Sequence, residues 1–259
     1  MKTLSVNNLC ASPYGRPLLK NISFELAAGQ VLGLMGPNGA GKSSLLHGIA
    51  GGIATDSGDI ALCGKTFKDW HALHRARALS MQVQHSALNF PFTVEEVILL
   101  GRAPHATGEA CDREVLAQVM AATDTGRLRH RPYTQLSGGE KQRVQLARAV
   151  AQVWREEDAQ ARLLLLDEPN SALDLSHQKM VLELVSHLAA NGCAILLATH
   201  DFNLLSSHAD ELLVMHEGRQ HSHGSANEVL TPAMFREVFD VQVLIQTHPQ
   251  SHAPLVIHT

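Results

Sequence analysis

The stretch GPNGAGKS at residues 36–43 constrains the fold of this chain more than any other segment. It fits the pattern G-x-x-x-x-G-K-[S/T] and lies between an apolar, strand-like run at 30–35 (QVLGLM) and a helical run at 44–50 (SLLHGIA). A phosphate-binding loop requires this order of strand, glycine loop and helix. Because glycine has no Cβ, successive backbone N–H groups can surround a phosphate. The sequence therefore predicts a nucleotide-binding protein.

The loop also indicates which side chains hold the nucleotide. Lys42 would reach the β- and γ-phosphate oxygens, and the hydroxyl of Ser43 would bind Mg²⁺. The residues predicted to line the phosphates are Gly36, Pro37, Asn38, Gly39, Ala40, Gly41, Lys42, Ser43 and Ser44.

Two further strand ends supply candidates for hydrolysis. The apolar run RLLLLD ends in Asp167 and Glu168, and the run CAILLAT ends at Thr199 and His200. In a parallel sheet these ends meet at the carboxyl edge, where ligands bind. We expect Asp167 to hold Mg²⁺, Glu168 to polarise the attacking water as general base, and His200 to contact the γ-phosphate.

Short strand patterns alternate with helical ones along the chain, which indicates an α/β fold. The apolar runs at 30–35, 162–167 and 193–199 read as the buried centre of a parallel sheet. The runs TLSVNNL, NISFEL and GDIALCG alternate apolar and polar residues, so they predict a smaller antiparallel sheet near the N-terminus. The fold class expected is a P-loop NTPase core with an N-terminal antiparallel β subdomain and an inserted α-helical subdomain.

Composition excludes several classes of function. The net charge of −4 argues against a general nucleic-acid binder, and the four cysteines form no CxxC pair that would suggest a zinc site. A reduced, cytoplasmic setting fits best. No signal-peptide pattern and no apolar run near the ~18 residues of a membrane helix is visible, so any membrane role is expected to come through a partner.

The stretch QLSGGEKQRV at 135–144 predicts a second anion-binding helix start. A helix N-terminus contributes only ~0.3–1 kcal/mol toward an exposed anion and ~2 kcal/mol when partly buried. That is too little for an independent nucleotide site, so a contribution to a site assembled elsewhere is the better interpretation.

Five segments taken together, GPNGAGKS, QLSGGEKQRV, LLLLDEP, SALD and ATHD, resemble the ATP-binding subunits of ABC transporters in their order and separation. The resemblance covers nearly the whole chain. It implies a single ATP-hydrolysing domain, with ATP and Mg²⁺ as cofactors, in which residues 1–84 and 153–240 form the core, 85–152 the helical subdomain and 241–259 a C-terminal β extension.

The resemblance also implies roles for residues outside the first loop. Tyr14 would stack on adenine, and Gln84 would touch Mg²⁺ and act in catalysis, with Gln82 as a less well placed candidate. Two chains packed head to tail would place the signature of each over the nucleotide of the other. Ser137, Gly138 and Gly139 make the signature loop, and Ser171–Asp174 form the segment that joins the two active sites. Glu140 and Asp174 are also expected among the nucleotide-binding residues.

The stretch HSALNFPFTVEEVILLGRAPH resembles importer ATPases for iron-siderophore complexes, cobalamin and haem, and within that group it looks most like the haemin importer subunit. This implies a homodimer with two transmembrane permease subunits at the cytoplasmic face of the bacterial inner membrane. A periplasmic haem-binding protein would act indirectly, with no direct substrate contact by this chain and no nucleic acid. The alternatives are a siderophore or cobalamin importer, an exporter ATPase and a nucleic-acid-associated ABC-type ATPase.

Three charged or polar stretches receive structural interpretations. WREEDAQAR at 154–162 is expected to be an exposed loop or helix end, and the histidine-rich MHEGRQHSHGS at 215–225 a solvated loop. The tail VQVLIQTHPQSHAPLVIHT at 241–259 alternates apolar and polar residues on both sides of a turn between Pro249 and Pro254. This pattern predicts a hairpin.

Overall fold

A six-stranded sheet forms the centre of the molecule in this computed structural model, which describes residues 2–13, 15–84, 88, 90–159 and 161–258. Its strand order is β10-β9-β3-β8-β7-β6, and all neighbours pair in parallel except β9 and β10. The central strands are buried throughout, as their apolar sequences predict. The strand bounds are β3 Val31–Met35, β6 Leu79–Gln82, β7 Leu163–Asp167, β8 Ala194–Ala198, β9 Glu211–His216 and β10 Arg219–Gly224.

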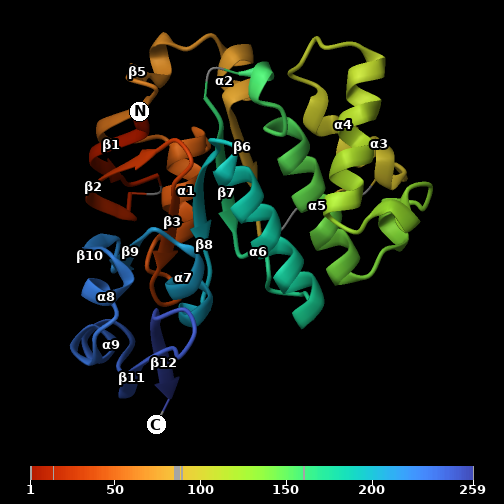
Figure 1. The fold of residues 1–259 in the computed structure, drawn as a ribbon. Coiled ribbons are helices and arrows are strands. Elements are labelled where there is room, and N and C mark those ends of the chain that lie inside the picture. Colours follow the sequence, from red (N-terminus) through yellow and green to blue (C-terminus); the bar gives the residue numbers. More distant parts are fainter. Residues whose placement is uncertain (1, 14, 85–87, 89, 160, 259) are drawn as a thin grey trace.

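A four-stranded antiparallel sheet of order β2-β1-β4-β5 lies on the N-terminal side of the molecule (Figure 1). Its strands are β1 Lys2–Ala11, β2 Leu19–Ala27, β4 Ser57–Leu62 and β5 Lys65–Thr66. Helix α1, Lys42–Ala50, precedes β4 in the sequence, and helix α2, Ala72–Ala78, follows β5. The prediction of a small antiparallel sheet formed by the alternating N-terminal runs is thus confirmed.

Helices α3, α4 and α5 gather on the opposite side (Figure 1), where α5 contacts the edge strand β6, and α6 packs against β8. Helix α3 begins at a capping box in which Thr93 and Glu96 bond each other's backbone N–H groups. The bounds are α3 Val94–Leu99, α4 Glu109–Ala122, α5 Gly138–Gln152 and α6 Leu175–Ala190.

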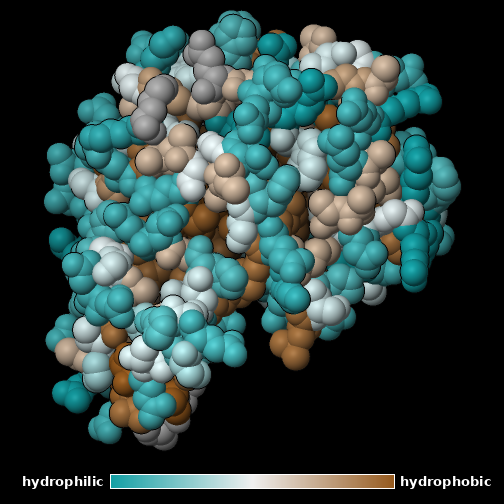
Figure 2. All heavy atoms as spheres, viewed as in Figure 1, coloured by the Kyte–Doolittle hydropathy of each residue, from teal (hydrophilic) through white to brown (hydrophobic). Residues whose placement is uncertain are grey.

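The C-terminal part packs below the sheet (Figure 1) and ends in the predicted hairpin, β11 Val243–Thr247 with β12 Pro254–His258. Its helices are α7 Phe202–His208, α8 Ala226–Val229 and α9 Pro232–Phe239. Phe202 of α7 packs edge-on against Phe235 and Phe239 of α9. On the face shown in Figure 2, polar residues dominate, and hydrophobic ones gather near this C-terminal region at the lower left.

Two hydrophobic cores lie on the two faces of the central sheet. One contains Leu32 and Leu34 of β3 with α1 and the antiparallel sheet, and the other contains Leu164 and Leu166 of β7 with α5 and α6. Because neighbouring side chains of a strand point to opposite faces, the continuous apolar strands contribute to both cores. Among the described residues, no helix combines the length and apolarity needed to span a membrane.

The prediction that residues 154–162 form an exposed loop or helix end holds for Glu156 and Glu157, which are exposed in a short 3-10 turn, but it is wrong for Asp158 and Arg162. Arg162 is buried and donates hydrogen bonds to the carbonyls of Val153 and Trp154 at 3.1 and 3.0 Å, and Asp158 pairs with the buried Arg102 at 2.8 Å. Charge alone suggested exposure, but these charges neutralise one another and cap free carbonyls.

The histidine-rich stretch also differs from its prediction, because residues 219–224 form the edge strand β10 rather than a solvated loop. His221 pairs with Glu237 at 3.2 Å and His223 with Glu211 at 2.9 Å. Within the part of the chain that the structure describes, no group of three or more His, Cys, Asp or Glu residues is arranged to hold a metal ion.

Candidate nucleotide site

The glycine loop connects β3 to α1 and has the backbone that only glycine adopts readily. Gly36, Gly39 and Gly41 have φ values of 147°, 79° and 102°. A Cβ on Gly36 would stand 2.3 Å from the carbonyl oxygen of Met215 in β9, so the loop is also pressed against the sheet. Gly41 is the N-cap of α1 and makes no side-chain hydrogen bond, which leaves the first N–H groups of this helix free for an anion.

Lys42 lies inside this loop and is only 7% exposed. Its Nζ donates to the carbonyl oxygens of Gly36 at 2.7 Å and Pro37 at 3.2 Å. Burial lowers the pKa of Lys42, while the carboxylates of Glu168 and Asp167 oppose that shift. The loop thus holds a partly desolvated cation at its centre, which is suited to a polyphosphate.

Asp167 ends β7 and is buried to 3% exposure. Burial raises the pKa of its carboxyl, and a hydrogen bond with Ser43 of α1 acts in the opposite direction. Ser43 and Asp167 are therefore neighbours, as predicted from their separate motifs. Hydroxyl and carboxylate oxygens are ligands of the kind that Mg²⁺ prefers. The amide of Gln84, the third predicted ligand, bonds the adjacent Glu168 through its nitrogen.

Two predicted residues from separate segments, Gln84 and His200, converge on the carboxylate of a third, Glu168. The Nε2 atom of Gln84 donates to Glu168 Oε2 at 2.8 Å, and His200 Nε2 lies 2.5 Å from Glu168 Oε1. Glu168 has a left-handed backbone with φ of 50°, and its N–H donates to the Ala198 carbonyl of β8 at 2.9 Å. Gln82, the weaker candidate, is fully buried with no hydrogen-bond partner for its amide among the described residues.

The signature segment forms the start of α5. Ser137 is the N-cap and Glu140 completes a capping box, since each side chain bonds the other residue's backbone N–H. Glu140 also pairs with Arg131 at 2.9 Å, and the hydrogen bond from the Ser137 N–H lowers the pKa of Glu140. In this structure the Glu140 carboxylate caps the helix.

The two glycines of the signature differ in their surroundings. A Cβ on Gly139 would stand 2.8 Å from the Ala172 carbonyl oxygen, whereas one on Gly138 would meet nothing within 4 Å. No hydrogen bond or ion pair among the described residues joins 137–140 to 36–44 within the chain.

The segment after Glu168 ends in Asp174, which is the N-cap of α6. The Asp174 side chain accepts from the N–H of His177 at 2.9 Å and the hydroxyl of Ser176 at 2.8 Å. These bonds lower the pKa of Asp174 to about 2. Tyr14, predicted to stack on adenine, lies outside the described residues.

One contact in the site was not predicted from the sequence. The Nε2 atom of Gln142 in α5 donates to the Glu168 carbonyl at 3.0 Å and so links the signature helix to the catalytic segment of the same chain. Gln142 lies three to four residues after Gly138 and Gly139, which places it on the same helix face. That spacing could have identified it.

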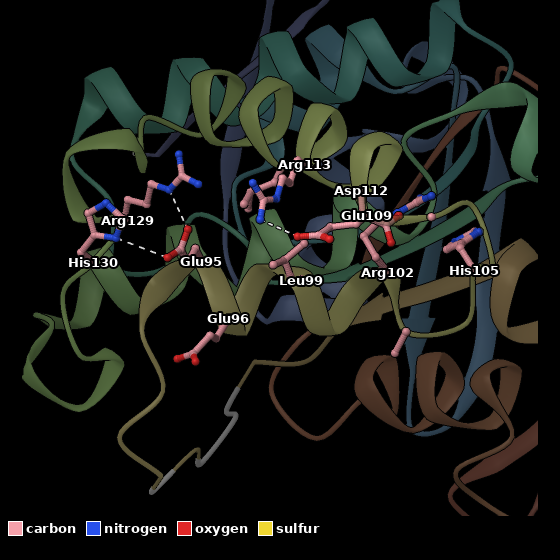
Figure 3. A pocket seen from close by; sticks show the side chains of 13 residues that line it. Glu95, Glu96, Leu99, Arg102, His105, Glu109, Asp112, Arg113, Arg129 and His130 are labelled. Atoms are coloured by element: carbon pink, nitrogen blue, oxygen red, sulfur yellow. Dashed lines mark hydrogen bonds and ion pairs between the residues drawn. The ribbon is translucent and has the colours of Figure 1, made fainter.

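A hollow of about 790 Å³ lies elsewhere, between α3 and α4 (Figure 3). Its charges are largely paired with one another: Glu95 lies between Arg129 at 2.7 Å and His130 at 3.3 Å, and Arg113 pairs with Glu109. It contains none of the predicted nucleotide ligands.

The glycine loop with its buried lysine, followed by an acidic pair at a neighbouring parallel strand end, defines a P-loop nucleoside triphosphatase. The ABC transporter family profile matches residues 19–171. The chain therefore belongs to the ABC transporter family, and the resemblance inferred from its motifs is confirmed.

The relatives and solved structures similar to this chain agree with that assignment. The chain is 44% identical over 254 residues to the Hemin import ATP-binding protein HmuV of Pseudomonas entomophila, covering 98% of this chain and 99% of the relative. It is 40% identical over 258 residues to the protein of the same name from Escherichia coli O157:H7, covering 98% of both. A metal-chelate type ABC transporter in an inward-facing conformation matches with a TM-score of 0.81 and 27% identity, over 100% of this chain and 97% of that one.

Proposed function

We propose that this chain is the ATP-hydrolysing subunit that powers import of haem across the bacterial inner membrane through partner membrane subunits. The observation that carries the hydrolytic part is the convergence of Gln84 and His200 on Glu168, beside the loop that buries Lys42. The choice of haem is supported by relatives named hemin import ATP-binding proteins, which are 40–44% identical over almost the full chain.

ATP lies with its phosphates in the loop formed by residues 36–44, where free N–H groups and Lys42 hold the β- and γ-oxygens. Ser43, Gln84 and Asp167 would hold Mg²⁺, which would supply positive charge to the phosphate oxygens. For these residues to bind ATP, Lys42 must exchange the Gly36 and Pro37 carbonyls for phosphate oxygens.

Glu168 orients the attacking water and takes its proton, and His200 fixes the position of the Glu168 carboxylate near the γ-phosphate. The Gln84 amide nitrogen donates to the same Glu168 carboxylate, so a movement of the Gln84 side chain would also move the general base. Tyr14 stacks on the adenine.

The active form is a homodimer in which Ser137, Gly138, Gly139 and Glu140 of one chain contact the ATP of the other, and Asp174 lies at the junction of the two sites. The isolated chain supports this arrangement, because its signature has no bond to its own phosphate loop among the described residues. Two permease subunits bind the dimer at the cytoplasmic face of the inner membrane, and a periplasmic haem-binding protein acts through them.

The test is to co-purify the chain with its permease subunits, reconstitute the complex and measure ATP hydrolysis with different loaded binding proteins. A haem-loaded binding protein should stimulate hydrolysis, whereas siderophore- and cobalamin-loaded ones should not. Stimulation by a siderophore or cobalamin carrier without any by the haem carrier would replace haem by that substrate and retain the importer.

A further inference from the structure

His177 lies in the first turn of α6 with a carboxylate oxygen at each of its two ring nitrogens. Its Nδ1 is 2.9 Å from Asp174 Oδ1, and its Nε2 is 3.3 Å from Asp124 Oδ2. The backbone N–H of His177 also donates to Asp174, so the contact with Asp174 exists without the side chain. What the imidazole alone adds is the link to Asp124.

Asp124 belongs to the helical side of the molecule. It follows the C-terminus of α4 in a left-handed backbone conformation with φ of 46°. Its carboxylate pairs with Arg143 of α5 at 3.0 Å, and Arg143 also donates to the Asp124 carbonyl. The contacts therefore run from Asp174, through His177 and Asp124, to the helix that begins at Ser137.

The segment 168–174 touches α5 directly at two other places, where Gln142 bonds the Glu168 carbonyl and Gly139 packs against the Ala172 carbonyl. The first of these contacts lies at the beginning of the segment and the second lies near its middle. At its end, Gln178 bonds the Leu173 carbonyl at 3.1 Å, which is a contact within the segment and α6. Beside the apolar contact between Leu173 and Gly139, His177 gives this end a polar link to the helical side.

The charges around His177 explain why a histidine suits this position. Asp174 and Asp124 face it with two carboxylates, and the one cation in the chain of contacts, Arg143, lies beyond Asp124. A side chain without a hydrogen-bond donor would leave the Asp174 and Asp124 carboxylates facing one another with no donor between them. A donor reaching only Asp174 would duplicate the backbone bond.

From this geometry we infer that His177 is a positioning residue that keeps Asp174 in a fixed relation to the signature helix α5, so that both reach the ATP of the partner copy together. The inference rests on the proposed ATP-dependent homodimer. It adds a residue outside the sequence motifs, whose task is alignment of two contributions to one composite site.

Amide substitutions separate the two bonds of the imidazole. In His177→Gln the amide nitrogen can reach the position of Nε2 and contact Asp124, whereas in His177→Asn it reaches only the position of Nδ1. His177→Ala removes both. The partner change is Asp124→Asn, because asparagine tolerates the left-handed backbone. Lys179→Ala is the matched control, since Lys179 is an exposed residue of the same helix whose ion-pair partner among the described residues is the exposed Glu183.

Each variant is measured in the full-length chain for kcat, for KM with MgATP, and, in a Glu168→Gln background, for ATP-dependent dimerisation. His177→Ala and His177→Asn should lower kcat about 3–30-fold, which lies within the range of couplings measured for residues in contact, and weaken dimerisation by a similar factor. ATP binding to the dilute chain should stay unchanged, and His177→Gln should restore most of kcat. His177→Ala combined with Asp124→Asn should lose less kcat than the product of the two single losses, while the part that Asp124 contributes through Arg143 is lost in either background.

Full kcat in His177→Asn, strictly additive effects of the two substitutions, or an equal loss in Lys179→Ala would overturn the inference. If His177→Ala does not fold, His177→Gln and His177→Asn still decide between the two bonds. A wild-type chain that does not hydrolyse ATP would contradict the proposed function itself, whereas normal wild-type hydrolysis with an unaffected His177→Ala would contradict only the role of His177.

Discussion

Lys42 and Asp167 place opposite charges close together in the interior at the phosphate loop, and both have pKa values shifted toward their neutral forms. Burial is the largest cause in each case, so desolvation exceeds the favourable interactions that the nucleotide-free chain provides. Charges arranged to receive a ligand commonly reduce stability in this way.

Asp167→Asn is therefore expected to stabilise the nucleotide-free chain while abolishing ATP hydrolysis. An acid whose pKa is higher in the folded state binds extra protons there between its two pKa values, so its ionised form weakens folding above that window. At pH 7 the gain should be about 1 kcal/mol, or about 3 °C in melting temperature.

Thermal unfolding measured across pH checks this expectation. The gain should shrink as the pH falls toward the ordinary Asp value of 3.8, where the wild-type carboxyl is also neutral. Asp59→Asn, on the exposed side of β4, serves as control and should leave the melting temperature unchanged. A destabilised Asp167→Asn would mean that the ionised carboxylate is net favourable in the fold.

Glu168→Gln should lower kcat about 10²–10⁴-fold, because it removes the general base but retains the size of the side chain. The variant should still bind ATP and accumulate as a dimer, which size-exclusion chromatography with light scattering measures. Glu183→Gln, an exposed change on α6, is the control. Turnover at the wild-type rate would show that another residue activates the water.

Most residues at this scale could be predicted because each lies at a strand end or in a glycine loop, where the motif fixes both type and place. The spacing of Gln142 from the signature glycines could have singled it out, but the bonding partner of Gln142 and that of His177 could not be predicted in the same way. Their roles depend on which carbonyl or carboxylate lies across from the helix, and that is decided by packing between segments far apart in sequence.

At the scale of elements, the start of α5 shows how closely a helix and a loop can be fitted. Gly139 lies against the Ala172 carbonyl of the segment that follows Glu168, and the neighbouring Gly138 faces open space. The two glycines therefore have different reasons for lacking a side chain.

Gly139→Ala should destabilise the chain by about 1–3 kcal/mol, since the new methyl group would displace a backbone carbonyl. Gly138→Ala should be neutral or slightly stabilising, because alanine favours the helix more than glycine does. Chemical denaturation of both variants measures the difference. Equal effects would mean that segment 168–174 moves aside without cost.

The elements that sequence patterns predicted best are the continuous apolar strands β3, β7 and β8, because burial on both faces removes any ambiguity of period. The edge strand β10 was not predicted because its residues are polar, and it is held in place by its backbone pairing with β9. The segment around Asp158 was missed because its charges find partners only after the chain has folded.

At the scale of the whole molecule, the phosphate loop and the signature belong to different parts of one chain. A head-to-tail pair of chains would form two sites, each with one loop and one signature. Sequence patterns within one chain predicted the parallel sheet and the smaller antiparallel sheet. Dimer formation depends on contacts between the surfaces of two chains, and it remains a prediction.

Complementation of two defective chains tests the pair. Lys42→Ala and Ser137→Ala homodimers should each be nearly inactive, but their mixed dimer has one site with an intact loop and an intact signature. Since random mixing makes about half of the dimers mixed, with one working site of two, an equal mixture should recover about a quarter of wild-type hydrolysis. A mixture no more active than the average of its components would place the whole site in one chain.

The signature makes no hydrogen bond or ion pair to its own phosphate loop among the described residues, and this has a cellular consequence. In the proposed dimer mechanism, a subunit that has not met its partner lacks half of each site, so it should hydrolyse little ATP. Wasteful hydrolysis is then limited before the transporter is assembled.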